Sequence, residues 1–202
     1  AMSYDLVIPA WHHGHVEPDA VQRALQATAD GGVIRLPTET VYGLGAVARD
    51  RAAVGRVFEI KGRPLDHPVI VHVAGPADLR TWGKGVANYA VRLAEGLWPG
   101  PLTLVVPAAD DVQRYLTGGQ DTVGLRCPAH PVALAVIEAT GPLAAPSANR
   151  FGQVSPTTAA DVVGDIGDRL APQRDLVLDG GPCPVGVEST ILDCTGDAPR
   201  VL

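Results

Sequence analysis

The chain lacks several features that would place it in whole classes of protein. Its 202 residues contain no apolar run near the roughly 20 residues that a membrane-spanning helix needs, and the N-terminus has no basic segment followed by an apolar one. Lys and Arg number 16 against 22 Asp and Glu, a formal charge of −6. We therefore expect a cytoplasmic protein without membrane contact, and we disfavour an extended nucleic-acid surface, because such surfaces need many cations.

Cysteine is also scarce. Cys127, Cys183 and Cys194 are odd in number and form no Cys-x-x-Cys pair, which argues against a disulfide framework and against a zinc site. We expect these cysteines to be reduced and structural. The histidines at 12, 13 and 15 come without a carboxylate or cysteine partner, so a solvated loop is favoured over a metal site there.

The common nucleotide-binding signatures are missing. Gly83-Lys84 is not followed by Ser or Thr, which excludes a P-loop. Residues 43–48 match G-x-G-x-x-A formally, but they lie several residues beyond the preceding strand, so a dinucleotide site is only weakly indicated. The G-x-S-x-G elbow of α/β-hydrolases is absent as well.

What the sequence does contain is a succession of helix and strand patterns. Helices are expected at 18–30, 50–60, 76–82, 86–96 and 131–141, with a further one capped by Thr157 or Thr158. Strands are expected at 6–8, 33–36, 69–73, 102–106, 122–126, 143–145, 175–178 and 187–193. Helices alternate with strands, yet some strands follow one another directly. We therefore predict an α/β fold with a twisted, mixed parallel and antiparallel open sheet flanked by helices.

The predicted domain organisation is a single domain over residues 1–202. Composition shows no break, and the length suits one well-packed α/β unit. Ala1 precedes Met2 and is interpreted as the remnant of a cleaved tag, and no second domain is visible.

Three separated segments each have several polar side chains directly after an apolar run: 38–45, 61–64 and 146–149. Each could be an ordinary turn, and the two cations of 61–64 could merely stabilise the end of a helix. Together with Arg126, which ends the strand at 122–126, Lys61 and Arg63 are also suited to hold phosphate or carboxylate oxygens. The combination favours a binding site over three unrelated turns.

These segments belong to a larger set that resembles the successive sequence blocks of the threonylcarbamoyl-AMP synthases, the YrdC-like family. The order and spacing of the blocks agree across nearly the whole chain, which makes the set far more specific than any one of them. The blocks are Pro37 to Gly45, Lys61 to Pro64 with Pro68 to Val73, Trp98 to Thr103, Gly124 to Pro128, Pro146 to Asn149, and Gly186 to Thr190.

The resemblance implies an enzyme that converts L-threonine, bicarbonate or carbon dioxide, and ATP to threonylcarbamoyl-AMP and pyrophosphate. The product would pass to a tRNA threonylcarbamoyl transferase that modifies the adenosine beside the anticodon, and direct contact of this chain with tRNA is left open. The family fold curves around a concave basic cavity. Mg²⁺ would enter with ATP, held more by the nucleotide than by protein carboxylates.

The resemblance also assigns roles to residues, motif by motif. Lys61 and Arg63 would be catalytic by neutralising the phosphates, and no metal ligand is assigned. ATP would be held by Lys61, Arg63, Thr103, Ser147, Asn149 and Ser155, and L-threonine by Thr38, His72, Arg126 and Ser189. For Glu39 and Glu188, the acids inside the motifs, turn-stabilising hydrogen bonds are favoured over a role as catalytic base.

Two other functions stay open. A carbamoyl-adenylate-forming carbamoyltransferase domain would normally sit beside acylphosphatase-like and Cys-rich zinc segments, and this sequence has neither. A non-catalytic RNA-binding or ribosome-associated module is disfavoured by the acidic charge and by the lack of an aromatic-rich basic stripe. In one departure from the family, the chain ends at Leu202, just before a further arginine that commonly reaches the nucleotide.

Overall fold

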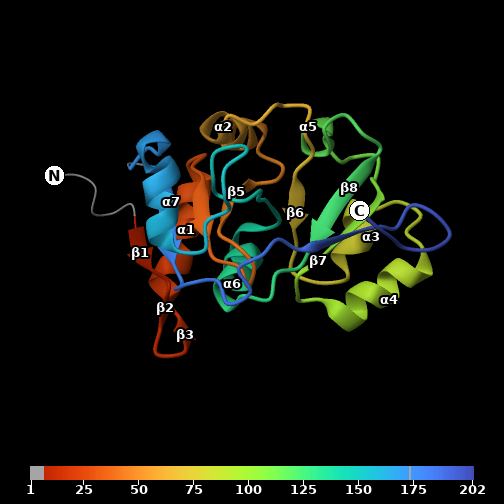
Figure 1. The fold of residues 1–202 in the computed structure, drawn as a ribbon, viewed down its shortest axis with the longest axis horizontal. Helices are drawn as coiled ribbons and strands as arrows, with labels where there is room; N and C mark the ends of the chain where they lie inside the picture. Colours follow the sequence, from red (N-terminus) through yellow and green to blue (C-terminus); the bar gives the residue numbers. More distant parts are fainter. Residues whose placement is uncertain (1–6, 173) are drawn as a thin grey trace.

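A ten-stranded mixed sheet forms the centre of the computed structural model, which describes residues 7–172 and 174–202 (Figure 1). Ala1 and the first residue of the strand expected at 6–8 lie outside these ranges. The strand order is β1-β10-β4-β5-β9-β6-β8-β7-β11-β12. The strands are β1 (Val7–Pro9), β4 (Ile34–Leu36), β5 (Gly43–Val47), β6 (Ile70–His72), β7 (Leu102–Pro107), β8 (Thr122–Arg126), β9 (Leu143–Ala144), β10 (Leu176–Asp179), β11 (Thr190–Asp193) and β12 (Arg200–Val201).

The sheet combines parallel and antiparallel pairs, as predicted. β1/β10, β10/β4, β6/β8 and β11/β7 are parallel, whereas β4/β5, β5/β9, β6/β9, β7/β8 and β11/β12 are antiparallel. The expected open α/β sheet is therefore confirmed. The extent of the domain, residues 1–202, stays a prediction.

Helices cover both faces of the sheet. They are α1 (Pro18–Ala29), α2 (Arg51–Lys61), α3 (Asp78–Trp82), α4 (Asn88–Leu97), α5 (Arg114–Thr117), α6 (Pro131–Thr140) and α7 (Ala159–Ile166). Alternate residues of β10 pack into two different hydrophobic cores, one on each face of the sheet. Leu176 and Leu178 pack with α1 and α6, whereas Val177 packs with α2 and α7. Figure 1 shows α1 and α7 at one end of the sheet and α3 and α4 at the other. None of the helices in the described ranges is long and apolar enough to cross a bilayer.

Both ends of α2 are capped by the residues that the sequence predicts. Asp50 accepts a hydrogen bond from Ala53 N at 3.1 Å at the start of the helix, and Gly62 ends it in the left-handed conformation with φ 67°. This αL residue lies directly between Lys61 and Arg63. The helix end therefore fixes where the two cations leave the chain.

The sequence patterns do not predict β5, because glycines occupy two of its five positions. Leu36 bears on one of them: a Cβ on Gly45 would meet Leu36 Cδ2 at 3.0 Å, so a side chain at this position would force Leu36 to shift. The β5/β9 pairing of Ala46 with Ala144 continues to a bridge between Gly43 and Ser147. The motif at 38–45 is thereby aligned with the motif at 146–149.

Two further departures concern short elements. The histidine segment 12–15, expected as a solvated loop, is exposed but lies in the hairpin of β2 (Trp11–His12) and β3 (His15–Val16). The strand expected at 187–193 starts only at Thr190, so residues 187–189 are irregular. Cys127, Cys183 and Cys194 are buried free thiols, as expected.

Candidate functional site

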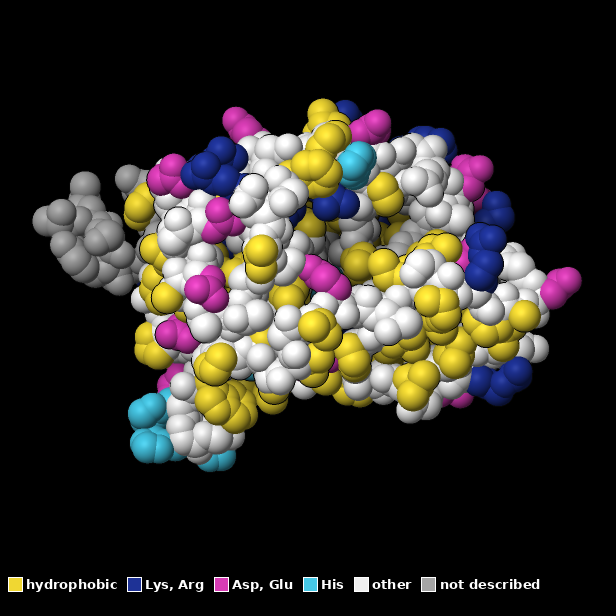
Figure 2. Space-filling view, in the orientation of Figure 1, with side chains coloured by type: hydrophobic (Ala, Val, Ile, Leu, Met, Phe, Trp, Pro, Cys, Tyr) yellow, Lys and Arg dark blue, Asp and Glu magenta, His cyan; other side chains and the backbone are white. Residues whose placement is uncertain are grey.

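Three loops converge on one face of the molecule. Glu39 O and Thr40 O accept hydrogen bonds from Val185 N at 2.8 Å and Gly186 N at 3.1 Å, and Tyr42 O accepts one from Ala148 N at 2.8 Å. The loops 38–42, 146–149 and 183–189, which are distant in sequence, are thus joined by backbone hydrogen bonds. Figure 2 shows this face hollowed near its middle, and the expected positive charge of that cavity stays a prediction.

A row of polar side chains lies side by side at the ends of three neighbouring strands. The register pairs His72 on β6 with Arg126 on β8, and Arg126 with Thr103 on β7. Residues paired across strands project to the same side of a sheet. The row therefore lies on the side opposite the large core, in which the intervening residues Leu104 and Leu125 are buried.

Arg126 is the most heavily bonded member of this row. Its Nη2 donates to Glu39 Oε1, its Nη1 to Thr40 Oγ1 at 2.9 Å and its Nε to Gly100 O at 3.3 Å. Burial lowers the pKa of the guanidinium, and the negative charges of Glu39 and Glu188 partly oppose that shift. Among the residues that the structure describes, three of its five N–H donors have acceptors, which leaves two for a ligand.

The Thr38 hydroxyl is built into a tight turn. It donates to Val41 O at 2.6 Å and lies 3.0 Å from Thr40 Oγ1. Thr38 Oγ1 also accepts from Thr40 N and Val41 N, both at 3.2 Å, and the Thr40 hydroxyl accepts from Arg126 Nη1. The turn therefore helps to orient the guanidinium of Arg126, whose Nη1 donates to Thr40.

His72 is buried beside Arg126. Burial is the main reason why the pKa of its imidazole falls to about 3, and the positive charge of Arg126 lowers the pKa further. The ring is therefore neutral at physiological pH. Its Nδ1 is buried and has no hydrogen-bond partner among the described residues.

Lys61 connects α2 to the loop that follows β9. Its ammonium donates to Ser147 O and to Asn149 O, both at 2.6 Å, and lies 3.5 Å from Asn149 Oδ1. The Asn149 amide in turn donates to Arg150 O and to Gln153 O, each at 2.7 Å. Burial, followed by the charge of Arg63, lowers the pKa of Lys61 to about 8. All three ammonium protons therefore have protein acceptors.

Arg63 is half-buried and more loosely held. Its Nη2 donates to Pro68 O at 2.7 Å, and its guanidinium carbon lies 5.9 Å from the centre of the Phe151 ring. Burial lowers its pKa, and its Nε is buried without a hydrogen-bond partner in the described part of the chain. Of the two cations in this motif, Arg63 keeps the greater donor capacity.

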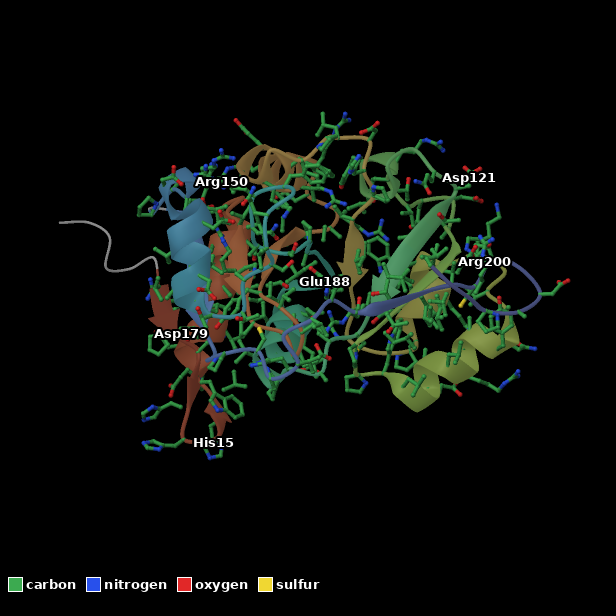
Figure 3. The ribbon with its side chains drawn as sticks, viewed as in Figure 1. His15, Asp121, Arg150, Asp179, Glu188 and Arg200 are labelled. Atoms are coloured by element: carbon green, nitrogen blue, oxygen red, sulfur yellow. The ribbon has the colours of Figure 1, made fainter. Side chains whose placement is uncertain are left out.

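Residues assigned to ATP and to L-threonine from the sequence contact one another. Thr103 Oγ1 and Ser189 Oγ are 2.7 Å apart, and Ser155 donates to Glu188 Oε1. The segment 188–189 therefore lies where the two sets of assigned residues meet. Figure 3 labels Glu188 near the centre of this face, and Figure 2 shows acidic atoms at the same place on the margin of the hollow.

The ten assigned residues thus fall into two connected groups. Lys61, Ser147 and Asn149 form one, with Arg63 beside them, and Thr38, His72, Thr103, Arg126 and Ser189 form the other. Ser155 joins through Glu188. Sequence reasoning gave no site role to Thr40 and Glu39, although their position in the motif at 38–45 was a signal. The carboxylate of Glu39, for which turn-stabilising hydrogen bonds were expected, instead accepts from Arg126 and from Ala129 N, which are 87 and 90 residues away.

Comparison with known proteins identifies the family and several relatives of this chain. The Sua5/YciO/YrdC family model, described as telomere recombination, matches residues 26–202. Threonylcarbamoyl-AMP synthase of Pyrococcus abyssi is 48% identical over 174 residues, covering 86% of this chain and 50% of the relative. Threonylcarbamoyl-AMP synthase of Bacillus subtilis is 44% identical over 184 residues, covering 90% of this chain and 52% of the relative. The chain spans about half the length of these curated relatives.

A solved structure is similar over almost the whole chain. The crystal structure of P. abyssi Sua5 complexed with L-threonine superposes with a TM-score of 0.91 at 43% identity, covering 98% of this chain and 56% of that one. The family model, the identity to the relatives and the shared fold lead to one conclusion. This chain belongs to the Sua5/YciO/YrdC family.

Proposed function

We propose that this chain forms threonylcarbamoyl-AMP and pyrophosphate from L-threonine, bicarbonate or carbon dioxide, and ATP, and is therefore a nucleotidyltransferase. One observation carries the proposal most directly: the buried row that contains Arg126 is connected through Thr103 to Ser189, and the adjacent Glu188 accepts from Ser155. The names of the relatives and the L-threonine bound in P. abyssi Sua5 support this choice of substrates.

The arrangement suits the chemistry. The free amine of L-threonine adds to carbon dioxide with loss of a proton, and an oxygen of the resulting carbamate attacks the α-phosphorus of ATP. A new P–O bond forms while the bond to the β-phosphate oxygen breaks, and pyrophosphate leaves with that electron pair. This reaction needs accurate positioning and neutralisation of phosphate charge more than it needs a strong acid or base.

The assigned residues supply these two functions. Arg126 presents its two remaining N–H donors to the L-threonine carboxylate, beside the neutral ring of His72, with Thr38 and Ser189 next to them. Lys61 and Arg63 provide positive charge for the phosphates, and Thr103, Ser147, Asn149 and Ser155 line the nucleotide side.

Mg²⁺ and the tRNA-modifying partner complete the proposal. Within the described ranges, no group of three or more His, Cys, Asp or Glu residues is arranged to hold a metal ion, so a site made by protein ligands alone does not fit. Mg²⁺ would instead arrive with ATP, whose phosphate oxygens are its usual ligands. The product would be consumed by a tRNA threonylcarbamoyl transferase.

The test is to measure pyrophosphate release from MgATP and bicarbonate, with and without L-threonine. Release that requires L-threonine, together with a product of the mass of threonylcarbamoyl-AMP, is the expected result. Release that ignores L-threonine and depends on carbamoyl phosphate would instead identify a carbamoyl-adenylate-forming domain. RNA binding without any release would favour the non-catalytic module.

A further inference from the structure

The loop 183–189 places one acidic side chain at the junction of residues assigned to ATP and residues assigned to L-threonine. Glu188 accepts a hydrogen bond from Ser155, and its neighbour Ser189 is hydrogen-bonded to Thr103 at 2.7 Å. Figure 3 shows Glu188 near the centre of the hollowed face, remote from the labelled charged residues at the periphery. Unlike Glu39, Glu188 is exposed and therefore open to a ligand.

The other motif acid is already committed to the protein. Glu39 Oε1 accepts from Arg126 Nη2, and its Oε2 accepts from Ala129 N at 2.7 Å. Both oxygens of the Glu39 carboxylate are therefore engaged, and its side chain is buried. Ser155 engages only Oε1 of Glu188, so this carboxylate has the acceptor capacity that Glu39 lacks.

Glu188 is also electrostatically close to both buried cations of the site. Its charge raises the pKa of Lys61 and that of Arg126, against the larger effect of burial. Its charge therefore acts both on the cation assigned to the phosphates and on the cation assigned to the ligand carboxylate. The amine of a bound α-amino acid would occupy the same region, because it must reach the α-phosphorus as a carbamate.

We propose that Glu188 binds the ammonium group of L-threonine, so that the substrate is recognised as a zwitterion by Arg126 at one end and by Glu188 at the other. This inference rests on the proposed function. A carboxylate at this junction would repel the phosphates of ATP, whereas an ammonium offers it a charge-assisted hydrogen bond. Ser155 orients the carboxylate by holding Oε1.

The experiment compares Glu188→Gln with the wild-type chain in the pyrophosphate-release assay. The variant keeps the size and the hydrogen-bonding shape but removes the charge, so the KM for L-threonine should rise by at least about tenfold while the KM for ATP changes less than about threefold. Glu188→Asp should recover part of the loss. Glu95→Gln, on an exposed face of α4, is the matched control and should behave as wild type.

A substrate analogue separates recognition of the amine from a structural effect. The compound that carries a hydroxyl in place of the amine of L-threonine should bind wild type and Glu188→Gln equally, as measured by calorimetry, whereas L-threonine should distinguish them. Equal weakening of both compounds, or an increased Mg²⁺ requirement in place of the KM effect, would overturn the assignment. If the wild-type chain itself releases no pyrophosphate with L-threonine, the proposed function fails, whereas an active wild type with an unaffected Glu188→Gln refutes this inference alone.

Discussion

The buried ion pair between Glu39 and Arg126 offers the most direct test of how the site is held together. Their side chains are only 9% and 5% exposed, and the two residues are 87 positions apart in sequence. Glu39→Ala would leave the guanidinium buried without its anion and Ala129 N without its acceptor. We expect the substitution to destabilise the fold strongly, because an unpaired buried charge is far less favourable than an intact pair.

The magnitude follows from the burial of the pair. Breaking a buried ion pair by removing one partner costs about 3–5 kcal/mol. For a chain of this length each kcal/mol lowers the Tm by roughly 2–4 °C, so Glu39→Ala should lower the Tm by about 10 °C. Glu39→Gln, which keeps an acceptor for one of the two donors, should lose less. Replacing both residues, as in Glu39→Ala with Arg126→Met, should restore much of the stability lost in the single variant.

The assay is thermal and urea unfolding, both followed by circular dichroism, which give the Tm and the free energy of unfolding for a double-mutant cycle. Asp110→Ala is the control, because Asp110 and Lys84 form an ion pair at 2.8 Å with side chains 86% and 63% exposed. The loss of this exposed pair should leave the Tm nearly unchanged. A loss below about 1 kcal/mol for Glu39→Ala, or a double variant whose loss equals the sum of the two single losses, would refute the reasoning.

Three other predictions concern charged side chains. Arg63→Ala should lower kcat/KM for ATP by about 100-fold or more. The Tm should change little, since Arg63 is half-buried and, within the described ranges, donates to Pro68 O. An unchanged kcat/KM in pyrophosphate release would contradict its role. Because the pKa of Lys61 is lowered to about 8, its ammonium loses its charge as the pH rises through that value. At saturating L-threonine, kcat/KM for ATP should therefore fall above that pH. A flat profile from pH 7 to 9.5 would exclude this dependence. Arg35→Met should raise the free energy of unfolding by about 1–3 kcal/mol, because Nε, Nη1 and Nη2 of this fully buried arginine have no hydrogen-bond partner in the described ranges. The nearby Asp175 keeps its two hydrogen bonds with Arg56 in the variant. Urea unfolding that shows a loss instead would indicate that Arg35 is satisfied in solution.

The sequence predicted local features well because their causes are local. Asp50 and Gly62 set the ends of α2 through contacts within the same few residues, and the β-branched run at 69–73 contains β6. Long-range features were not predictable in the same way. β5 is a strand because β4 and β9 pair with it on both sides, which no property of its Gly-rich segment reveals. The role proposed for Glu188 depends likewise on Ser155, 33 residues away.

The hydrogen bonds of the site also constrain how it can bind phosphates. The three ammonium protons of Lys61 are directed at Ser147 O, Asn149 O and Asn149 Oδ1, so Lys61 attracts a phosphate mainly through its charge as long as these bonds persist. Arg63, with its unpartnered Nε, is better able to bond a phosphate oxygen directly. Lys61 would therefore act both by shaping the 147–149 loop and by providing a field that is screened little by salt, because the ammonium is buried. Arg63 would supply the directional contacts, which explains why one motif contains both kinds of cation.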